Sequence, residues 1–148
     1  MKVLIVEDDQ FKLDALRVIV EAELIDAKVE FRKSVQAAVK AITSKDFDLL
    51  VLDMSLPSHD LDTASGLGIP RLSGGIEVLF EMQYQRKFVR TIIVTQYPEI
   101  ELENQMIPIH EVAKYLMESF EIEVECCLFF DYENTNWSEL FKKRVLKK

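Results

Sequence analysis

Short aliphatic runs alternate with segments of helical periodicity along most of the chain. Two of these runs, at residues 3–6 and 49–52, are wholly apolar, and a third, at 91–95, has three aliphatic residues between two threonines. A strand can be apolar at consecutive positions only when both of its faces are covered, as in a parallel sheet between helices. The segments between the runs repeat apolar residues every three or four positions, which is the period of an amphipathic helix. The alternation therefore predicts an α/β fold.

The expected order is a strand followed by a helix, repeated five times. Strands are expected at residues 3–6, 28–32, 49–52, 91–95 and 124–130. Helices are expected around the apolar series Leu13/Leu16/Val20/Leu24, Val35/Ala38/Val39/Ile42, Ile76/Leu79/Phe80, Ile109/Val112/Leu116/Phe120 and Trp137/Leu140/Phe141/Val145. Ser34 is expected to cap the second helix, and Pro108 suits the first turn of the fourth. Right-handed crossovers in such a chain place helices on both faces of one parallel sheet.

One long loop interrupts this rhythm. All four glycines lie between residues 54 and 75, together with Pro57 and Pro70. The 148 residues otherwise suit one globular domain, so we expect a single domain over 1–148 with an inserted loop at about 58–74. This loop is either a lid or docking element, or a tolerated surface insertion. Its Asp60 and Asp62 are not assigned as metal ligands.

The charge of the chain limits its partners. The formal net charge is −8, and five positive charges fall in the last seven residues, so the remainder carries −13. Such an acidic body disfavours direct binding of nucleic acid but suits a divalent cation. No apolar stretch reaches the length of a membrane span, and the N-terminus lacks a signal-peptide core. We therefore expect a soluble cytoplasmic protein without a membrane contact.

Polar residues stand where the buried strands end. Glu7 and Asp8 follow the first strand, Asp53 follows the third, and Thr95 ends the fourth. In open parallel sheets the ligand site lies at the carboxyl ends of the strands. Unit charges about 4 Å apart repel by roughly 4 kcal/mol at an effective dielectric constant of 20, so a cluster of carboxylates requires protons or a hard cation such as Mg²⁺. The simpler interpretation is that these acids only cap the following helices.

Four segments carry a resemblance to a known family. They are residues 2–9 (KVLIVEDD), 49–57 (LLVLDMSLP), 75–79 (GIEVL) and 91–95 (TIIVT). Together they resemble the CheY-like receiver domain of two-component response regulators. The resemblance implies a flavodoxin-like, doubly wound (βα)5 sandwich with a parallel five-stranded sheet in the order 2-1-3-4-5.

The resemblance also implies roles for particular residues. Asp53 would accept a phosphoryl group from a histidine kinase or a phosphotransfer protein. Mg²⁺ would be held by Asp8 and Asp53, by Glu7 partly through water, and by the backbone carbonyl of Ser55. Thr95 would be the switch hydroxyl.

The rotating aromatic residue of the family falls near Phe130, with Phe129 as the alternative. A homodimer would use the face formed by the fourth helix, the fifth strand and the fifth helix.

Two features depart from the family. The first is the long loop after Asp53, which the family crosses in far fewer residues, and the second is the end of the last strand. Receivers carry a lysine followed by proline at the end of the fifth strand, and alignment of the last helix places Glu133 there. A carboxylate would repel a phosphoryl group at that position. Three explanations remain: phosphorylation is impaired, another cation such as Arg71 substitutes, or this end aligns differently.

These observations leave three functions in competition. The first is an atypical receiver that binds Mg²⁺, is phosphorylated on Asp53, and switches a protein–protein surface toward an output protein or an effector domain. It would not be an enzyme beyond self-phosphorylation and autodephosphorylation at Asp53. The second is a degenerate pseudo-receiver that acts as a phosphorylation-independent interaction or dimerisation module. The third is a phosphohydrolase of the haloacid-dehalogenase type, disfavoured because Ser55 stands where that family has a second Asp.

Overall fold

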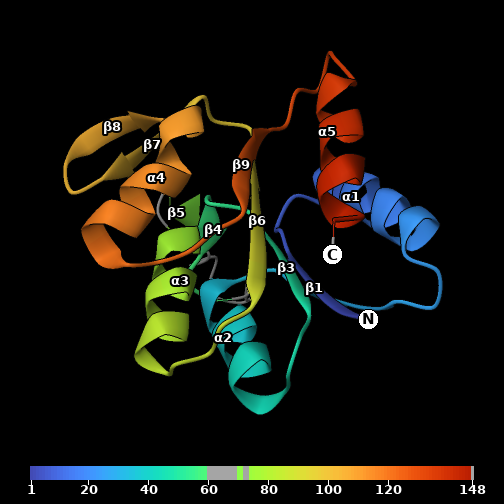
Figure 1. Ribbon diagram of the computed structural model, residues 1–148, viewed down its shortest axis with the longest axis horizontal. Helices are drawn as coiled ribbons and strands as arrows, with labels where there is room; N and C mark the ends of the chain where they lie inside the picture. Colours follow the sequence, from blue (N-terminus) through green and yellow to red (C-terminus); the bar gives the residue numbers. More distant parts are fainter. Residues whose placement is uncertain (60–69, 72–73, 148) are drawn as a thin grey trace, which may run out of the picture.

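Five strands form one parallel sheet in the computed structural model, which describes residues 1–59, 70–71 and 74–147 (Figure 1). The strands are β1 (Lys2–Val6), β2 (Lys28–Arg32), β3 (Leu49–Leu52), β6 (Arg90–Thr95) and β9 (Cys126–Phe129). Their spatial order is β2-β1-β3-β6-β9, and every neighbouring pair is parallel. The expected flavodoxin-like order 2-1-3-4-5 is therefore confirmed.

Five helices cover the two faces of this sheet. They are α1 (Gln10–Glu23), α2 (Val35–Ser44), α3 (Gly74–Tyr84), α4 (Ile109–Phe120) and α5 (Asn136–Val145). Helices α1 and α5 lie on one face, and α2, α3 and α4 lie on the other (Figure 1). None of the helices in the described part of the chain is long and apolar enough to cross a membrane.

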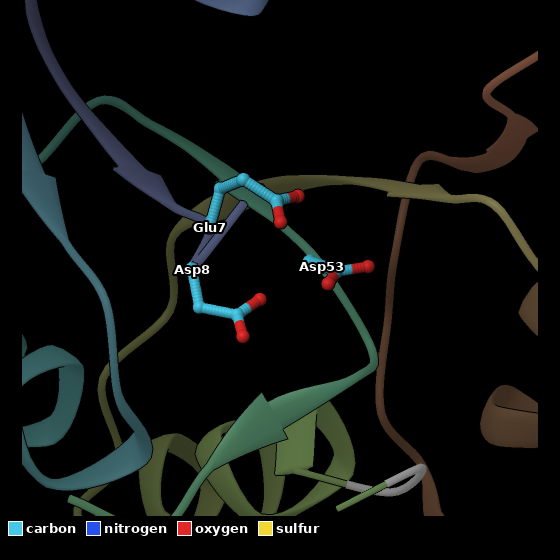
Figure 2. A group of neighbouring side chains, drawn as sticks. All are labelled: Glu7, Asp8 and Asp53. Carbon is cyan, nitrogen blue, oxygen red and sulfur yellow. The ribbon is translucent and has the colours of Figure 1, made fainter. Parts of the chain in front are cut away.

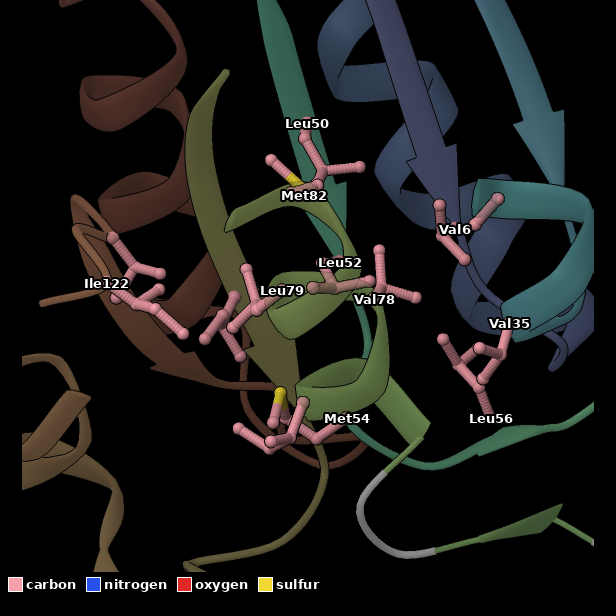
Figure 3. Packing of buried hydrophobic residues seen from close by; sticks show 14 of the residues in the cluster. Val6, Val35, Leu50, Leu52, Met54, Leu56, Val78, Leu79, Met82 and Ile122 are labelled. Atoms are coloured by element: carbon pink, nitrogen blue, oxygen red, sulfur yellow. The ribbon is translucent and has the colours of Figure 1, made fainter. Parts of the chain in front are cut away.

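Alternate residues of each strand supply two separate hydrophobic clusters. In β1, Val3 and Ile5 pack toward α1 and α5, whereas Leu4 and Val6 pack toward the other three helices. Figure 3 shows the cluster on the side of the sheet covered by α2, α3 and α4, in which strand residues contact Val78 and Leu79 of α3. Since successive side chains of a strand point to opposite faces, a two-sided core requires apolar residues at every position. This requirement explains the aliphatic runs in the sequence.

Two of the helices, α1 and α2, begin after a side chain that accepts a hydrogen bond from one of their free N–H groups. The Asp9 side chain accepts a hydrogen bond from the Lys12 N–H at the start of α1. Ser34 accepts one from Ala37 N–H, as expected for the cap of α2. Pro108 directly precedes α4. These caps fix where the chain turns from each strand end into the next helix.

A small hairpin that the sequence reading did not anticipate lies between β6 and α4. Strands β7 (Glu99–Leu102) and β8 (Gln105–Pro108) pair antiparallel, and Glu103 and Asn104 at the turn have φ of 50° and 61°. Two consecutive residues with positive φ suit the turn of a two-residue hairpin. The signal in the sequence was the alternation that buries Ile100 and Leu102 and leaves their neighbours exposed.

The inserted loop is described only at its two ends. Strands β4 (Leu56–Pro57) and β5 (Pro70–Arg71) pair antiparallel and bring these ends together. The expected roles of the loop, and Asp60 and Asp62 within it, lie outside the described residues. The last strand is also shorter than the expected 124–130, since β9 covers only Cys126–Phe129.

Candidate functional site

Three carboxylates meet at the carboxyl edge of the sheet. Val6 of β1 is paired with Leu52 of β3, so Glu7 and Asp53 are the next residues on two adjacent strands. One carboxylate oxygen from each of Glu7, Asp8 and Asp53 lies within 4.8 Å of the others. Figure 2 shows the three side chains gathered around one space, two from the end of β1 and one from the end of β3. The structure thus brings together the acids that the sequence places far apart.

Burial makes this cluster costly to ionise. Glu7 and Asp53 are buried, with 0% and 2% of their surfaces exposed, and Asp8 is half-buried. Loss of solvation, and next the nearby charge of Asp53, raises the pKa of Glu7 to about 8. Loss of solvation also raises the pKa of Asp8 and of Asp53 above their ordinary values. The site therefore holds more negative charge than its surroundings can solvate, and it requires a cation.

A lysine from α1 supplies one positive charge. The Nζ of Lys12 lies 2.6 Å from Oε2 of Glu7 and 2.8 Å from Oδ1 of Asp53, and the side chains of all three residues are fully buried. The same ammonium donates a hydrogen bond to Oε1 of Gln96 at 3.2 Å. The ammonium thus donates hydrogen bonds to Asp53 and Gln96 and forms an ion pair with Glu7. Lys12 lowers the pKa of both carboxyls, against the larger effect of burial.

Sequence reasoning did not identify Lys12, although its position carries a signal. Lysine is almost never fully buried unless it is paired, so a lysine on α1 is assigned to solvent by default. Lys12 nevertheless stands four residues before Leu16 and next to Leu13, on the buried side of the helix. Residues three or four apart share a helix face, and this spacing was the available clue.

Thr95 ends β6 beside the last strand. Its side chain is fully buried, and Oγ1 accepts a hydrogen bond from the Tyr97 N–H at 3.2 Å. Its backbone is paired with Phe129, and its carbonyl accepts a hydrogen bond from the Phe130 N–H. Ser55 is also buried, two residues beyond Asp53. The switch role of Thr95 and the metal role of the Ser55 carbonyl stay predictions.

The two aromatic candidates at the end of β9 have different surroundings. Phe130 is 2% exposed and Phe129 is 42% exposed. The ring centroids of Phe130 and Trp137 are 4.4 Å apart, and Nζ of Lys12 lies 5.9 Å from the centroid of the Phe130 ring. Phe130 is thus the aromatic residue that borders the ammonium, whereas Phe129 faces outward. Whether Phe130 rotates as a switch stays a prediction.

The expected position of Glu133 is corrected by the structure. Strand β9 ends at Phe129, and Glu133 is an exposed residue in the following loop, where its N–H bonds to the Asp131 side chain. The helix-based alignment failed because residues 130–135 form this loop before α5 begins at Asn136. Phe130 is the residue that directly follows the strand end. The side chain of Arg71, the other candidate cation, lies outside what the structure describes.

The donor set fits a small hard cation. Oδ2 of Asp53 is buried and makes no hydrogen bond within the described part of the chain. Both oxygens of Glu7 are engaged, one by the Asp9 N–H and one by Lys12, so Glu7 would reach a metal through water. Carboxylate oxygens with retained water are the ligands that Mg²⁺ prefers. Asp8 and Oδ2 of Asp53 are therefore the direct ligands that this arrangement offers.

Comparison with known proteins agrees with this geometry. Residues 3–123 match the family described as response regulator receiver domain. The chain is 33% identical over 140 residues to the Detocs response regulatory protein DtcB of Vibrio alginolyticus, covering 93% of this chain and 94% of the relative. It is 32% identical over 150 residues to the DtcB protein of Enterobacter cloacae (strain JD6301), covering 100% and 97%.

A solved structure shares the fold. The response regulator protein TrrA from Thermotoga maritima, in complex with Mg(2+)-BeF, aligns with a TM-score of 0.61 at 19% identity, covering 98% of each chain. This likeness concerns the arrangement of strands and helices. The match over residues 3–123 and the two relatives establish the family on sequence. The chain belongs to the response regulator receiver domains.

Proposed function

We propose that the chain receives a phosphoryl group on Asp53 in a Mg²⁺-dependent reaction. The observation that carries this proposal is the state of the two Asp53 oxygens. Oδ1 is held by Lys12, while Oδ2 is buried and makes no hydrogen bond to any described residue. One oxygen of this carboxylate lies within 4.8 Å of carboxylate oxygens of Glu7 and Asp8. Oδ2 is therefore open to a bound cation, and Oδ1, which Lys12 orients, is the oxygen positioned to attack phosphorus.

The reaction is a displacement at phosphorus. An oxygen of Asp53 forms a bond to the phosphorus of a phosphohistidine, and the P–N bond breaks with its electron pair remaining on the imidazole, which then takes up a proton. A bound Mg²⁺ would offset negative charge on the phosphoryl oxygens. Asp8 and Asp53 would hold it directly and Glu7 through water, and burial of the cluster keeps bulk solvent away from the acyl phosphate.

Phosphorylation is proposed to alter the face formed by α4, β9 and α5. Thr95 connects the site to β9 through its pairing with Phe129, and α4 packs against the same strand. Met117 of α4 and Phe129 of β9 expose 44% and 42% of their surfaces. The donor would be a histidine kinase or a phosphotransfer protein in the cytoplasm. The recipient would be an output protein, an effector domain or a second copy of this chain.

Asp53→Asn is expected to abolish phosphorylation, because the amide nitrogen that replaces one oxygen is not a nucleophile under these conditions. The protein is incubated with Mg²⁺ and phosphoramidate, a small donor with a P–N bond, and the mass gain of one phosphoryl group is measured. Asp46→Asn is the matched control, since Asp46 is exposed and pairs only with Lys87 within the described residues. Labelling of the Asp53→Asn variant equal to the unaltered protein would contradict the proposal.

The affinity for Mg²⁺ is expected to rise with pH. The pKa of Glu7 is raised to about 8, and burial also raises the pKa values of Asp8 and Asp53, so protons compete with the metal throughout the neutral range. Between about pH 6 and pH 8 the dissociation constant should fall by about tenfold or more. Isothermal titration calorimetry at several pH values measures it. A dissociation constant that does not change over this interval would contradict the assigned ligands.

The pseudo-receiver remains the second candidate, and one observation favours it. Lys12 already offsets the charge of Glu7 and Asp53 without a metal or a phosphoryl group. Such a site could persist as a purely structural ion pair. Absence of both labelling and a response to Mg²⁺ with beryllofluoride would select this function.

A further inference from the structure

We propose that Lys12 is the ammonium that binds the phosphoryl group on Asp53, so that helix α1 supplies the charge that other receivers supply from the end of the fifth strand. This inference rests on the proposed function and concerns the same site. A residue of helix α1 would thus replace the lysine that is missing from the end of the fifth strand.

The first observation is the placement of the ammonium. Nζ of Lys12 lies 2.8 Å from Oδ1 of Asp53, so a group bonded to Asp53 would lie within reach of it. Among the side chains that the structure describes, in residues 1–59 and 74–147, Asp53 forms no other ion pair. The side chain extends from the first turn of α1, where the Asp9 cap fixes the backbone. Lys12 is therefore held in position rather than free to sample solvent.

The second observation is what occupies the end of β9. Phe130 directly follows the strand, is buried, and contacts Trp137 through its ring. An aromatic residue leaves no cation at this position. The ring instead lies 5.9 Å from Nζ of Lys12, a distance at which it attracts the ammonium. The strand end thus accommodates a charge that comes from α1.

The third observation is the arrangement of acceptors around the ammonium. Asp53 and Gln96 each accept a hydrogen bond from it, and Glu7 forms an ion pair with it at 2.6 Å. Glu7 and Gln96 can keep their bonds when Asp53 is modified, while the donor that points at Asp53 becomes available to a phosphoryl oxygen. A charge-assisted hydrogen bond of this kind is among the stronger ones in proteins. The side chain can exchange one anion for another without leaving its place.

A purely structural role makes the opposite prediction for ligand binding. If Lys12 only offsets the carboxylates, its removal should free them for Mg²⁺ without weakening any phosphoryl analogue that Mg²⁺ recruits. If Lys12 binds the phosphoryl group, its removal should leave Mg²⁺ binding intact or stronger and weaken the analogue. The two ligands together separate the roles.

The experiment compares Lys12→Met and Lys12→Gln with the unaltered chain. Mg²⁺ alone is titrated by calorimetry, and beryllofluoride is then titrated at saturating Mg²⁺, with bound fluoride followed by fluorine NMR. We expect beryllofluoride affinity to fall by about 10- to 150-fold in both variants. Mg²⁺ affinity should be unchanged or higher. Lys12→Gln retains a polar group of similar length, so it tests the charge even if Lys12→Met does not fold.

Two controls keep the outcomes distinct. Lys33→Met removes an exposed positive charge that bonds to Gln10 of α1, and Glu133→Lys adds one in the loop after β9; both should bind beryllofluoride as the unaltered chain does. Equal beryllofluoride affinity in the Lys12 variants and the unaltered chain would overturn the role of Lys12 alone. Failure of the unaltered chain to bind the analogue would overturn the proposed function and this inference with it.

Discussion

Lys12→Met is expected to lower the free energy of unfolding of the metal-free protein by about 3–5 kcal/mol near pH 8. The substitution keeps the length of the side chain but leaves Glu7 and Asp53 buried without the ammonium that lies between them. Breaking a buried ion pair by removing one partner is costly because the remaining charge can be neither solvated nor paired. An effect of this size would make Lys12 one of the largest single contributors to the stability of the metal-free protein.

The pH dependence gives this prediction its sign. Without Lys12 the pKa values of both carboxyls should rise further, so the variant takes up protons on folding and loses stability as pH increases. Near pH 5 protonation removes most of the penalty, and the difference from the unaltered chain should shrink. Urea unfolding in the presence of a chelator, at both pH values, measures the two differences.

Added Mg²⁺ offers an independent check on the same variant. A cation bound by Asp8 and Asp53 would replace part of the lost charge, so Mg²⁺ should stabilise Lys12→Met more than it stabilises the unaltered chain. Lys33→Met is the control and should remain within about 0.5 kcal/mol of the unaltered chain, because Lys33 is exposed. A pH-independent loss that Mg²⁺ does not reduce would point to packing rather than charge.

Gly75→Ala is the second change for which we expect a large effect. A Cβ at this position would overlap the carbonyl oxygen of Asp53 and lie 2.9 Å from Cα of Met54. Alanine favours a helix over glycine by about 1 kcal/mol, but forcing atoms into a packed backbone costs about 1–3 kcal/mol. The Met54 side chain can move away from the added atom, but the closest overlap is with backbone, so we expect a net loss of stability. Asp53, the proposed phosphoryl acceptor, should shift as well.

Two measurements test the substitution of Gly75. Chemical unfolding should show a loss of about 1–2 kcal/mol after the helix preference is included. Beryllofluoride affinity should also fall, because the residue that moves carries the acceptor carboxylate. Tyr84→Ala, at an exposed position of the same helix, should change neither. Unaltered affinity together with lost stability would show that α3 relaxes and leaves Asp53 in place.

The sheet and the position of the acidic cluster could be predicted from the sequence because both follow from local patterns. Runs such as Leu49–Leu52 are apolar at every position, and this excludes most alternatives to a covered parallel strand. The order of elements then requires Glu7 and Asp53 to lie at one edge. These inferences need no knowledge of which side chains touch.

The sequence did not predict that Lys12 supplies the positive charge at the site, because the burial of this side chain depends on tertiary packing. Lysine is common on helix surfaces, and only the packing of α1 against the sheet shows that Lys12 is fully buried. Glu133 was misplaced for a related reason, since the alignment assumed that the last loop has the usual length. The β7–β8 hairpin was missed because its strands are short and not continuously apolar, and because its turn residues Glu103 and Asn104 lack the glycine typical of such turns.

The cap of α1 has a consequence for how this site can change. One short segment, from the end of β1 to the first turn of α1, carries nearly every charge that surrounds Asp53. Its six consecutive residues include Glu7, Asp8, the capping Asp9 and Lys12. The end of β9 therefore does not have to supply a charged residue to the site, and aromatic side chains can pack there. Substitutions there can remodel the neighbouring surface for a new partner while the electrostatics of the reacting centre stay constant.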